Sequence, residues 1–453
     1  MTGEFIVAKI KQLDKIEGAD KIVSSNLFGE TIITSTNTKV GTVGLLFDIE
    51  TVLSLELCQK LNLHRHSNLN DNKEVVGYFD DARRVRPIRL KGVKCSAFFL
   101  PLDGIEVFTG LDLLEDLKVG AQGNNIGEYP ICAKYLKKRI RTENKEGKIK
   151  EDLVPTFKQH LDTDQALRNM QKVQVGDLAI ISEKIHGTSF RCGYLLTKTK
   201  LSLWSQFFNF IANGIWNTHT NVYNFIVGSR RVLKFIGGEE FKNKQSYYDR
   251  DLWTFVAKRE FEGKLEKGET IYGEIAGYDL SGGLIIGSQG NKKLKPFMGK
   301  KEYKTFIDRY GEITEFTYGC TLDEDPENKT LFNLEKINKV FVYRITTTNE
   351  DGVSMDLSWE QVKMRCEQMN VNHVPELAKF LIQEGDTQMI EDYLIDEAKE
   401  PSRLFPQHLR EGVCLRLEGS SLTPKIFKEK NYFFKVIERI IKETEETNLE
   451  DEN

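Results

Sequence analysis

Short apolar runs separated by turn-forming residues fill the first part of the chain. Four such runs are bounded by Gly, Asp or Asn, a pattern that predicts short β-strands. They cover residues 5–10, 21–27, 30–35 and 41–47, and a helical piece follows at 53–61. Strands of this length at this spacing are typical of a small β-barrel, so we expect one within residues 1–120.

Residues 82–94 alternate basic and apolar side chains. On a strand, this period of two would put Arg84, Arg86 and further cations on one face. A basic barrel face can serve as a platform for nucleic acid. A solvated edge strand, where lysine and arginine are common, is an equally good interpretation.

Residues 121–155 have the composition of a basic linker, with loop-forming Gly and Asn, two prolines and a run of cations. A second domain is expected over 156–440, followed by an acidic tail at 441–453. Within this domain, the aromatic-rich residues 203–227 predict an amphipathic helix. A further segment is interpreted as a helical insertion: residues 354–404, with helices predicted at 359–369 and 375–384.

The stretch Leu178–Ser189 runs from a short buried strand into a charged turn. The strand ends at Glu183 and Lys184, and Gly187 follows three residues after the lysine. A charge at the end of a buried strand is costly, and it is tolerated where the amine is there to react. Gly187 would let the backbone approach a phosphate or ribose, or adopt a positive φ. The bare Lys-x-x-Gly pattern also fits an ordinary surface turn. Other parts of the sequence are needed to distinguish that turn from a reactive lysine.

Two carboxylates and two lysines lie on or directly beside predicted strands later in the chain. Glu274 lies in the apolar run 270–277, and Glu411 directly precedes an alternating strand. Both are hard oxygen donors suited to Mg²⁺ or its waters. Lys428 and Lys430 are two residues apart, so on a strand they share a face and could stabilise charge on a phosphate. Taken singly, each of these residues also fits an exposed position on a strand.

Two more side chains complete the pattern. Arg230, in the run 227–231, offers a cation for ribose or phosphate. Residues 339–345 form a predicted strand with aromatic side chains, of which Tyr343 could stack on a purine.

Together and in this order, these stretches resemble the ATP-dependent RNA ligases of the covalent nucleotidyltransferase superfamily, in the branch with an N-terminal OB module. Glu183–Ser189 looks like the nucleophile motif of that branch, and His160–Thr163 looks like its lead-in. Residues 15–21 and 89–93 look like its OB module, and Ser402–Leu404 also fits. The resemblance implies a multidomain α+β fold. An N-terminal OB-like β-barrel would precede a ligase-type nucleotidyltransferase domain with antiparallel sheets and flanking helices.

The resemblance also implies the chemistry. Lys184 attacks the α-phosphorus of ATP, AMP passes from the lysine to a 5′-phosphate, and a 3′-hydroxyl displaces AMP to seal the strand. The expected cofactors are ATP and Mg²⁺ or Mn²⁺, and the expected partner is nicked RNA or an RNA-containing duplex. The catalytic residues so implied are Lys184, Lys428 and Lys430, and the metal ligands are Glu274 and Glu411. The implied nucleotide contacts are Glu183, Ile185, Gly187, Arg230, Glu274, Tyr343, Glu411, Lys428 and Lys430.

A lysine nucleophile must be unprotonated, whereas a free lysine has a pKa of about 10.4. A shift of about three units, or about 4 kcal/mol, brings it near neutrality. Burial and neighbouring cations, including a metal ion, act in that direction. If the barrel holds the substrate, we expect Arg84→Ala with Arg86→Ala to weaken sealing and to spare self-adenylylation.

Two other functions fit parts of the pattern. A GTP-using mRNA capping guanylyltransferase shares the lysine motif, but capping enzymes place an OB domain after the last lysine motif, and few residues follow Lys430. A noncatalytic RNA-binding protein could keep the fold, but every residue assigned to the chemistry is present. Nucleotide choice and covalent labelling distinguish the three.

The composition limits which partners and which cellular compartment are expected. The net charge of −4 argues against nonspecific coating of nucleic acid by the whole surface, and it leaves room for a local basic groove. We expect no secretory signal and no membrane span. The seven cysteines form no C-x-x-C pair, which disfavours zinc and a disulfide framework. We therefore expect a cytoplasmic monomer in a reducing compartment.

Overall fold

The computed structural model describes most of the chain. The described residues are 4–49, 51–113, 117–135, 154–200, 204, 211, 219–240, 248, 250–320, 338–419, 421 and 423–437. Residues 136–153 of the predicted linker and the predicted acidic tail at 441–453 lie outside them.

All four strands predicted in the N-terminal part form, close to their expected bounds. The elements are β1 (Phe5–Lys9), β2 (Asp14–Lys15), β3 (Ile22–Leu27), β4 (Glu30–Ser35), β5 (Val43–Asp48), β6 (Thr51–Leu53), α1 (Leu55–Lys60), η1 (Ser67–Leu69), β7 (Ile88–Leu90), β8 (Val93–Cys95), β9 (Ala97–Pro101), α2 (Leu102–Thr109), β10 (Gln122–Gly123), β11 (Asn125–Ile126), β12 (Tyr129–Pro130) and β13 (Cys132–Lys134). Helix α1 matches its prediction, and Ser54 caps it by accepting a hydrogen bond from the Leu57 amide.

These strands form several antiparallel sheets, chiefly a four-stranded one in the order β10-β1-β5-β9 and a three-stranded one, β2-β3-β4. Among the described strands the pairings do not close into a barrel, so the OB-like barrel stays a prediction. Strand β10 pairs with β1, and β13 pairs with β6. Residues 122–134, which the sequence assigns to the linker, are therefore built into the N-terminal sheets.

The basic run 82–94 does not form the single strand that its alternation predicts. It contains the hairpin β7–β8, which turns at Lys91–Gly92, where φ is 48° and 87°. Arg84 is buried, with its guanidinium 4.0 Å from the ring centroid of Tyr135. Arg86 forms a 2.7 Å ion pair with an aspartate. The prediction of one continuous basic face was wrong, because a glycine turn folds the run back on itself and two of its arginines bind within the protein.

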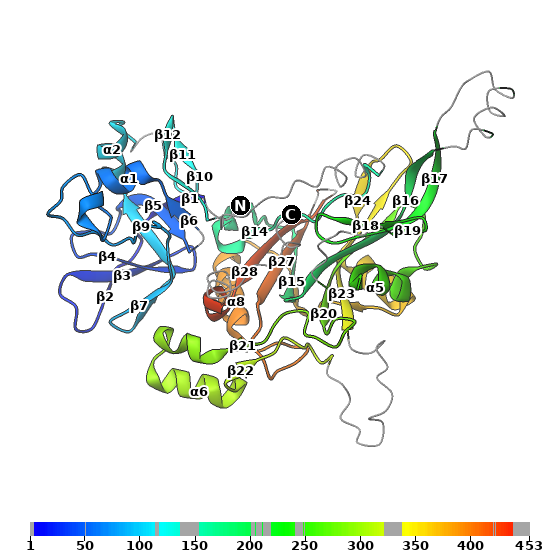
Figure 1. The fold of residues 1–453 in the computed structure, drawn as a ribbon. Coiled ribbons are helices and arrows are strands. Elements are labelled where there is room, and N and C mark those ends of the chain that lie inside the picture. The colour runs from blue at the N-terminus through cyan, green and yellow to red at the C-terminus, as the bar shows by residue number, and fades with distance from the viewer. Residues whose placement is uncertain are drawn as a thin grey trace.

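The second part of the chain consists mainly of two sheets with flanking helices (Figure 1). The strands are β14 (Asp164–Gln165), β15 (Leu178–Lys184), β16 (Thr188–Lys200), β17 (His219–Gly228), β18 (Leu233–Ile236), β19 (Glu239–Glu240), β20 (Glu269–Gly277), β21 (Gln289–Gly290), β22 (Ile313–Thr314), β23 (Asn338–Thr348), β24 (Ser354–Asp356), β25 (Asn372–His373), β26 (Glu376–Leu381), β27 (Gly412–Glu418) and β28 (Lys425–Lys430). One sheet is five-stranded, in the order β14-β28-β27-β15-β26, and the other is eight-stranded, built on β19-β18-β17-β16-β20-β23-β24. The chain therefore has the mixed α+β architecture with antiparallel sheets that was predicted.

Helices cover both sheets. They are η2 (Ala166–Arg168), η3 (Met170–Lys172), α5 (Leu252–Phe261), η4 (Asn291–Phe297), α6 (Lys300–Tyr310), α7 (Trp359–Met369) and α8 (Thr387–Lys399). Trp253 of α5 and Trp359 of α7 are fully buried in the core against the eight-stranded sheet. Ile390 and Leu394 of α8 are buried against the five-stranded sheet. This core fixes the edge where the two sheets meet.

Two helix predictions in this part were wrong. Most of 375–384 is strand β26, which pairs with β15. Residues 219–227, in the second half of the predicted helix 203–227, belong to β17 and pair with β16, which suits a segment rich in aromatic and β-branched residues. The predicted helix at 359–369 is confirmed as α7. Strands β24 and β25 belong to the eight-stranded sheet, and β26 belongs to the five-stranded sheet. Residues 354–404 are therefore part of the domain and not a separate helical insertion.

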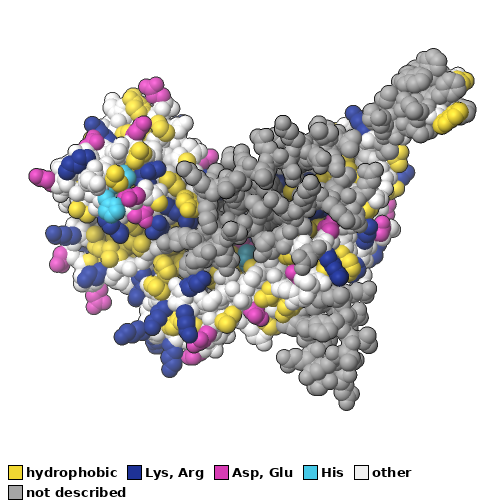
Figure 2. All heavy atoms as spheres, in the orientation of Figure 1, with side chains coloured by type: hydrophobic (Ala, Val, Ile, Leu, Met, Phe, Trp, Pro, Cys, Tyr) yellow, Lys and Arg dark blue, Asp and Glu magenta, His cyan; other side chains and the backbone are white. Residues whose placement is uncertain are grey.

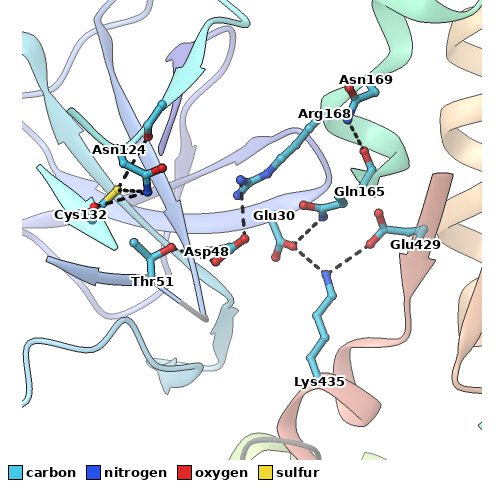
Figure 3. A network of polar contacts seen from close by, with 11 residues as sticks. Glu30, Asp48, Thr51, Asn124, Cys132, Gln165, Arg168, Asn169, Glu429 and Lys435 are labelled. Atoms are coloured by element: carbon cyan, nitrogen blue, oxygen red, sulfur yellow. Dashed lines mark hydrogen bonds and ion pairs between the residues drawn. The ribbon is translucent and has the colours of Figure 1, made fainter. Parts of the chain in front are cut away.

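The two parts of the chain are joined by buried charges (Figure 3). Lys435 Nζ lies 2.7 Å from Glu30 Oε1 in β4 and 3.3 Å from Glu429 Oε1 in β28. Beside this group, Arg168 lies 3.6 Å from Asp48. All five side chains are at least four-fifths buried. The N-terminal part therefore docks on the back of strand β28.

Among the helices described, none is long and apolar enough to cross a membrane. All seven cysteines lie in described parts of the chain and are free thiols.

Candidate active site

The Lys-x-x-Gly turn connects the two main sheets. Strand β15 ends at Lys184 in the five-stranded sheet, and β16 begins at Thr188 in the eight-stranded sheet, so residues 185–187 cross between them. A Cβ at Gly187 would lie 2.3 Å from the carbonyl oxygen of Ile275 on β20. Glycine is required here because two backbone segments approach closely, and not because of a positive φ.

Lys184, Glu411 and Lys430 meet at this crossing. Lys184 is opposite Gly412 in the β15–β27 ladder, and Gly412 is opposite Lys430 in the β27–β28 ladder. Lys184 Nζ lies 2.8 Å from Glu411 Oε1, and Lys430 Nζ lies 3.3 Å from the same oxygen. The Glu411 side chain is only 2% exposed, whereas that of Lys184 is 22% exposed. Lys184 is thus partly exposed beside a buried carboxylate.

These charges control one another's protonation. Burial would raise the pKa of Glu411, but Lys184, Lys430 and His186 together hold that pKa well below its usual value. Burial and the charge of Lys430 would lower the pKa of Lys184, but the Glu411 carboxylate, with smaller contributions from Cys414 and Glu274, raises that pKa above its usual value. The protein by itself therefore keeps Lys184 protonated. A lysine nucleophile needs a lowered pKa, and the ion pair with Glu411 acts in the opposite direction.

Glu274 approaches the same place from the eight-stranded sheet. It is half-buried on β20 and accepts a 3.0 Å hydrogen bond from Ser189 Oγ on β16. The other oxygen of the neighbouring carboxylate, Glu411 Oε2, is buried and accepts no hydrogen bond from the described residues. In the same residues, no three His, Cys, Asp or Glu side chains gather as a ligand set. Glu411 Oε2 lies 3.8 Å from His186 Nδ1. Two carboxylates, one with an oxygen that accepts no hydrogen bond from the described residues, fit a divalent cation that keeps most of its waters or binds phosphate oxygens.

Tyr343 of β23 lies in an aromatic group with His160. The Tyr343 hydroxyl and His160 Nδ1 share a hydrogen bond, and the His160 ring meets Tyr272 edge-on at 5.3 Å. Burial, with help from Arg191 and other arginines, lowers the pKa of His160 well below its usual value. Burial also raises the pKa of Tyr343. Both rings are therefore neutral, which suits aromatic side chains that stack on a nucleobase.

Arg230 and Lys428 lie near a third charged residue, Asp162. Arg230 Nη2 forms a 2.7 Å ion pair with Asp162 Oδ1. Burial would raise the pKa of Asp162, but the hydrogen bond from Arg230 and the charges of Arg231 and Lys428 lower it. The segment 160–163 thus brings the two predicted phosphate-binding cations to one edge of the site.

Glu183 and Ile185 lie elsewhere. The Glu183 carboxylate accepts a 2.7 Å hydrogen bond from the Arg403 amide and lies 3.8 Å from Arg410. The Ile185 side chain is buried in the apolar core. Since neighbouring residues of a strand point to opposite faces, Glu183 supports the turn from behind Lys184.

A family model described as RNA ligase matches residues 177–437, more than half of the chain. The chain belongs to the RNA ligase family. The matched region contains Lys184, Glu274, Glu411 and Lys430. No curated protein sequence matches the chain.

Solved structures of Naegleria gruberi RNA ligase share the fold of this RNA ligase. A mutant solved with ATP and Mn has a TM-score of 0.51 and 15% identity, and the match covers 95% of this chain and 98% of that one. The protein solved with PPi has a TM-score of 0.50 and 15% identity, with coverage of 97% and 98%. The shared fold extends over both parts of the chain.

Two residues of this RNA ligase site, Tyr318 and Phe434, were not predicted. The Tyr318 hydroxyl accepts a 2.7 Å hydrogen bond from the His186 amide, and Tyr318 has a φ of 49°. The Phe434 ring lies 4.6 Å from that of His186, edge-on, and 5.8 Å from Lys430 Nζ. No sequence spacing connects Tyr318 with a turn 132 residues away, so only the fold could reveal its role.

Proposed function

We propose that this family member is an ATP-dependent RNA ligase that joins 3′-hydroxyl and 5′-phosphate ends through a lysyl-AMP intermediate. The observation that carries the proposal is the convergence of Lys184, Lys430 and Glu411 where the two sheets meet. Naegleria gruberi RNA ligase has been solved with ATP and Mn, with AMP and Mn, and with PPi, which supports the proposal by analogy.

In the first step, Lys184 Nζ loses its proton and attacks the α-phosphorus of ATP. A P–N bond forms, the bond to the bridging oxygen breaks, and diphosphate leaves with the electron pair. Lys430 and Lys428 would hold the α-phosphate and stabilise the charge that develops on it. Tyr343 would stack on the adenine, and Arg230 would contact ribose or phosphate.

The ion pair with Glu411 has to be weakened before Lys184 can react, because it raises the pKa of the amine. Glu411 and Glu274 would hold Mg²⁺ or Mn²⁺, Glu411 through Oε2, which accepts no hydrogen bond from the described residues. The bound ion would supply positive charge that neutralises these carboxylates and favours the unprotonated amine. With the carboxylate so occupied, burial and Lys430 would dominate at Lys184.

In the later steps, an oxygen of the RNA 5′-phosphate attacks the phosphorus of lysyl-AMP, and the lysine leaves. The 3′-hydroxyl then attacks the activated 5′-phosphate, and AMP leaves. We propose a nicked RNA or RNA-containing duplex as substrate, residues 1–120 as an OB-like nucleic-acid-binding module, and 156–440 as the adenylyltransferase domain. All the proposed groups come from one chain, so a monomer would suffice.

The test is incubation with α-labelled ATP and Mg²⁺ followed by a denaturing gel, with labelled GTP and Lys184→Ala in parallel. We expect label from ATP that stays on the wild-type chain and is absent from Lys184→Ala. Label from GTP alone would instead indicate a capping guanylyltransferase. A folded wild-type chain that takes no label from either nucleotide would refute catalysis and favour a noncatalytic RNA-binding protein.

A further inference from the structure

Six exposed cations lie along the border between the two parts of the chain. They form what we call the basic ridge: Arg89, Lys91, Lys295, Lys300, Lys301 and Lys304. Two come from the β7–β8 hairpin and four from η4 and α6. In Figure 2, dark-blue side chains gather at the lower left, over the position of α6 in Figure 1.

Contacts between the two parts make the ridge one surface. Strand β7 contacts η4. A Cβ at Gly299, the N-cap of α6, would lie 3.6 Å from Arg89 Nη2. Lys94 of β8 forms an ion pair with Glu302 in the first turn of α6. The hairpin and the helix are thereby held together, and Arg89 lies next to the start of α6.

The positions of the lysines on α6 do not favour the helix itself. Lys300 and Lys301 open its first turn, where the helix dipole favours acidic side chains. Lys300 and Lys304 are four residues apart, so like charges lie on one side of the helix. A cluster that works against the stability of its own helix points to a negatively charged ligand.

The ridge is close to the proposed catalytic lysines. Residues 432–437 are helical and begin two residues after the end of β28. Phe433 packs on α6, with its ring 5.6 Å from that of Phe306, and Lys94 Nζ lies 4.5 Å from the Phe433 ring. The next residue, Phe434, contacts Lys430. The helical turn with Phe433 and Phe434 therefore lies between α6, which carries part of the ridge, and Lys430.

We propose that the basic ridge binds the phosphate backbone of the RNA duplex on one side of the joined ends. This inference rests on the proposed ligase function and names the surface that holds its substrate. It also replaces the predicted platform at Arg84 and Arg86, which bind within the protein. Clamping the backbone across both parts of the chain would fix the register of the ends over Lys184.

The test compares two full-length variants with equal charge change. One is Lys300→Glu with Lys301→Glu and Lys304→Glu. The control is Lys39→Glu with Lys267→Glu and Lys399→Glu, three exposed lysines on other elements. The ridge variant should fold, since two of its new glutamates occupy the first turn of α6. Circular dichroism and self-adenylylation check this.

Affinity for a nicked RNA duplex is measured at several salt concentrations. For the ridge variant, we expect Kd at about 0.1 M salt to rise by at least about tenfold, and the slope of log K against log[salt] to fall by about two to three. Sealing should fall with affinity while self-adenylylation stays at the wild-type level. The control should lose much less.

Unchanged affinity in the ridge variant, or an equal loss in the control, would overturn the proposal. If the proposed ligase function itself is wrong, the results differ from those that refute the ridge. In that case the wild type would take no label from ATP, whereas the comparison of RNA affinities would still be readable.

Discussion

Lys435 offers the sharpest test of how the two parts of the chain are held together. It lies between the carboxylates of Glu30 and Glu429, and its side chain is only 16% exposed. Lys435→Met keeps much of the apolar length of the side chain and removes the charge. It leaves two buried carboxylates without their shared cation.

The magnitude follows from the geometry. At the observed 2.7 Å between Lys435 Nζ and Glu30 Oε1, the attraction is about 6 kcal/mol at an effective dielectric constant of about 20, before the cost of desolvation. Removing one partner of a buried pair typically costs about 3–5 kcal/mol, because the remaining charge stays buried. We expect a loss of that size for Lys435→Met.

Urea unfolding followed by circular dichroism measures the loss. The matched control is Lys399→Met, because Lys399 is 62% exposed in its ion pair and should contribute less than about 1 kcal/mol. A cycle with Glu30→Gln should give a coupling energy of about 0.5–3 kcal/mol. A loss below about 1 kcal/mol for Lys435→Met, with no coupling to Glu30, would refute the reasoning.

The pH dependence gives a second check on the same group. Burial would raise the pKa of Glu30, but Lys435 outweighs it and lowers that pKa below its ordinary value of 4.5. The ionised Glu30 therefore adds stability above that value, and the contribution is lost as pH falls through the lowered pKa. The deficit of Glu30→Gln relative to wild type should shrink below pH 4.5. Burial raises the pKa of Glu429, so Glu429→Gln should cost less at neutral pH.

Three other predictions concern the site and the N-terminal part. Gly187→Ala should reduce self-adenylylation at least about tenfold, because its Cβ would clash with a backbone carbonyl at 2.3 Å; a wild-type rate of labelling would contradict this. Glu411→Gln removes the charge that raises the pKa of Lys184, so the residual labelling rate should reach its plateau at lower pH than in the wild type, and an unshifted pH profile would count against the ion pair. Arg84→Ala should lower unfolding stability by about 1–3 kcal/mol because it empties a buried site, whereas loss of RNA affinity alone at full stability would restore the arginine to a substrate platform.

The local pattern of apolar and polar residues predicted the strands on which the proposed catalytic residues lie. Lys184, Glu274 and Lys428 all lie on strands close to where alternation and apolar runs place them. That agreement is expected, because a half-buried strand has a period of two whatever its neighbours are. The ligase resemblance then supplied the order of the motifs, which periodicity alone does not give.

Features that depend on contacts between distant parts of the chain could not be predicted from the sequence. Residues 376–381 have an ambiguous pattern, and they become a strand because β15 offers an edge to pair with. Arg84 looks like its neighbour Arg89 in the sequence, yet one is buried against Tyr135 and the other is exposed. Neither difference has a local signal, since both are decided by residues far away in the chain.

The two faces of strand β28 contact different parts of the protein. This limits where the chain can be truncated without affecting the proposed site. Lys428 and Lys430 face the proposed site, and Glu429 between them faces Lys435 and the N-terminal part. A chain cut after the N-terminal part would expose Lys435 and Glu429 to water at the base of the strand that carries both lysines. A catalytic fragment of this protein would thus be altered at Lys428 and Lys430 by a cut made more than 200 residues away from them along the chain.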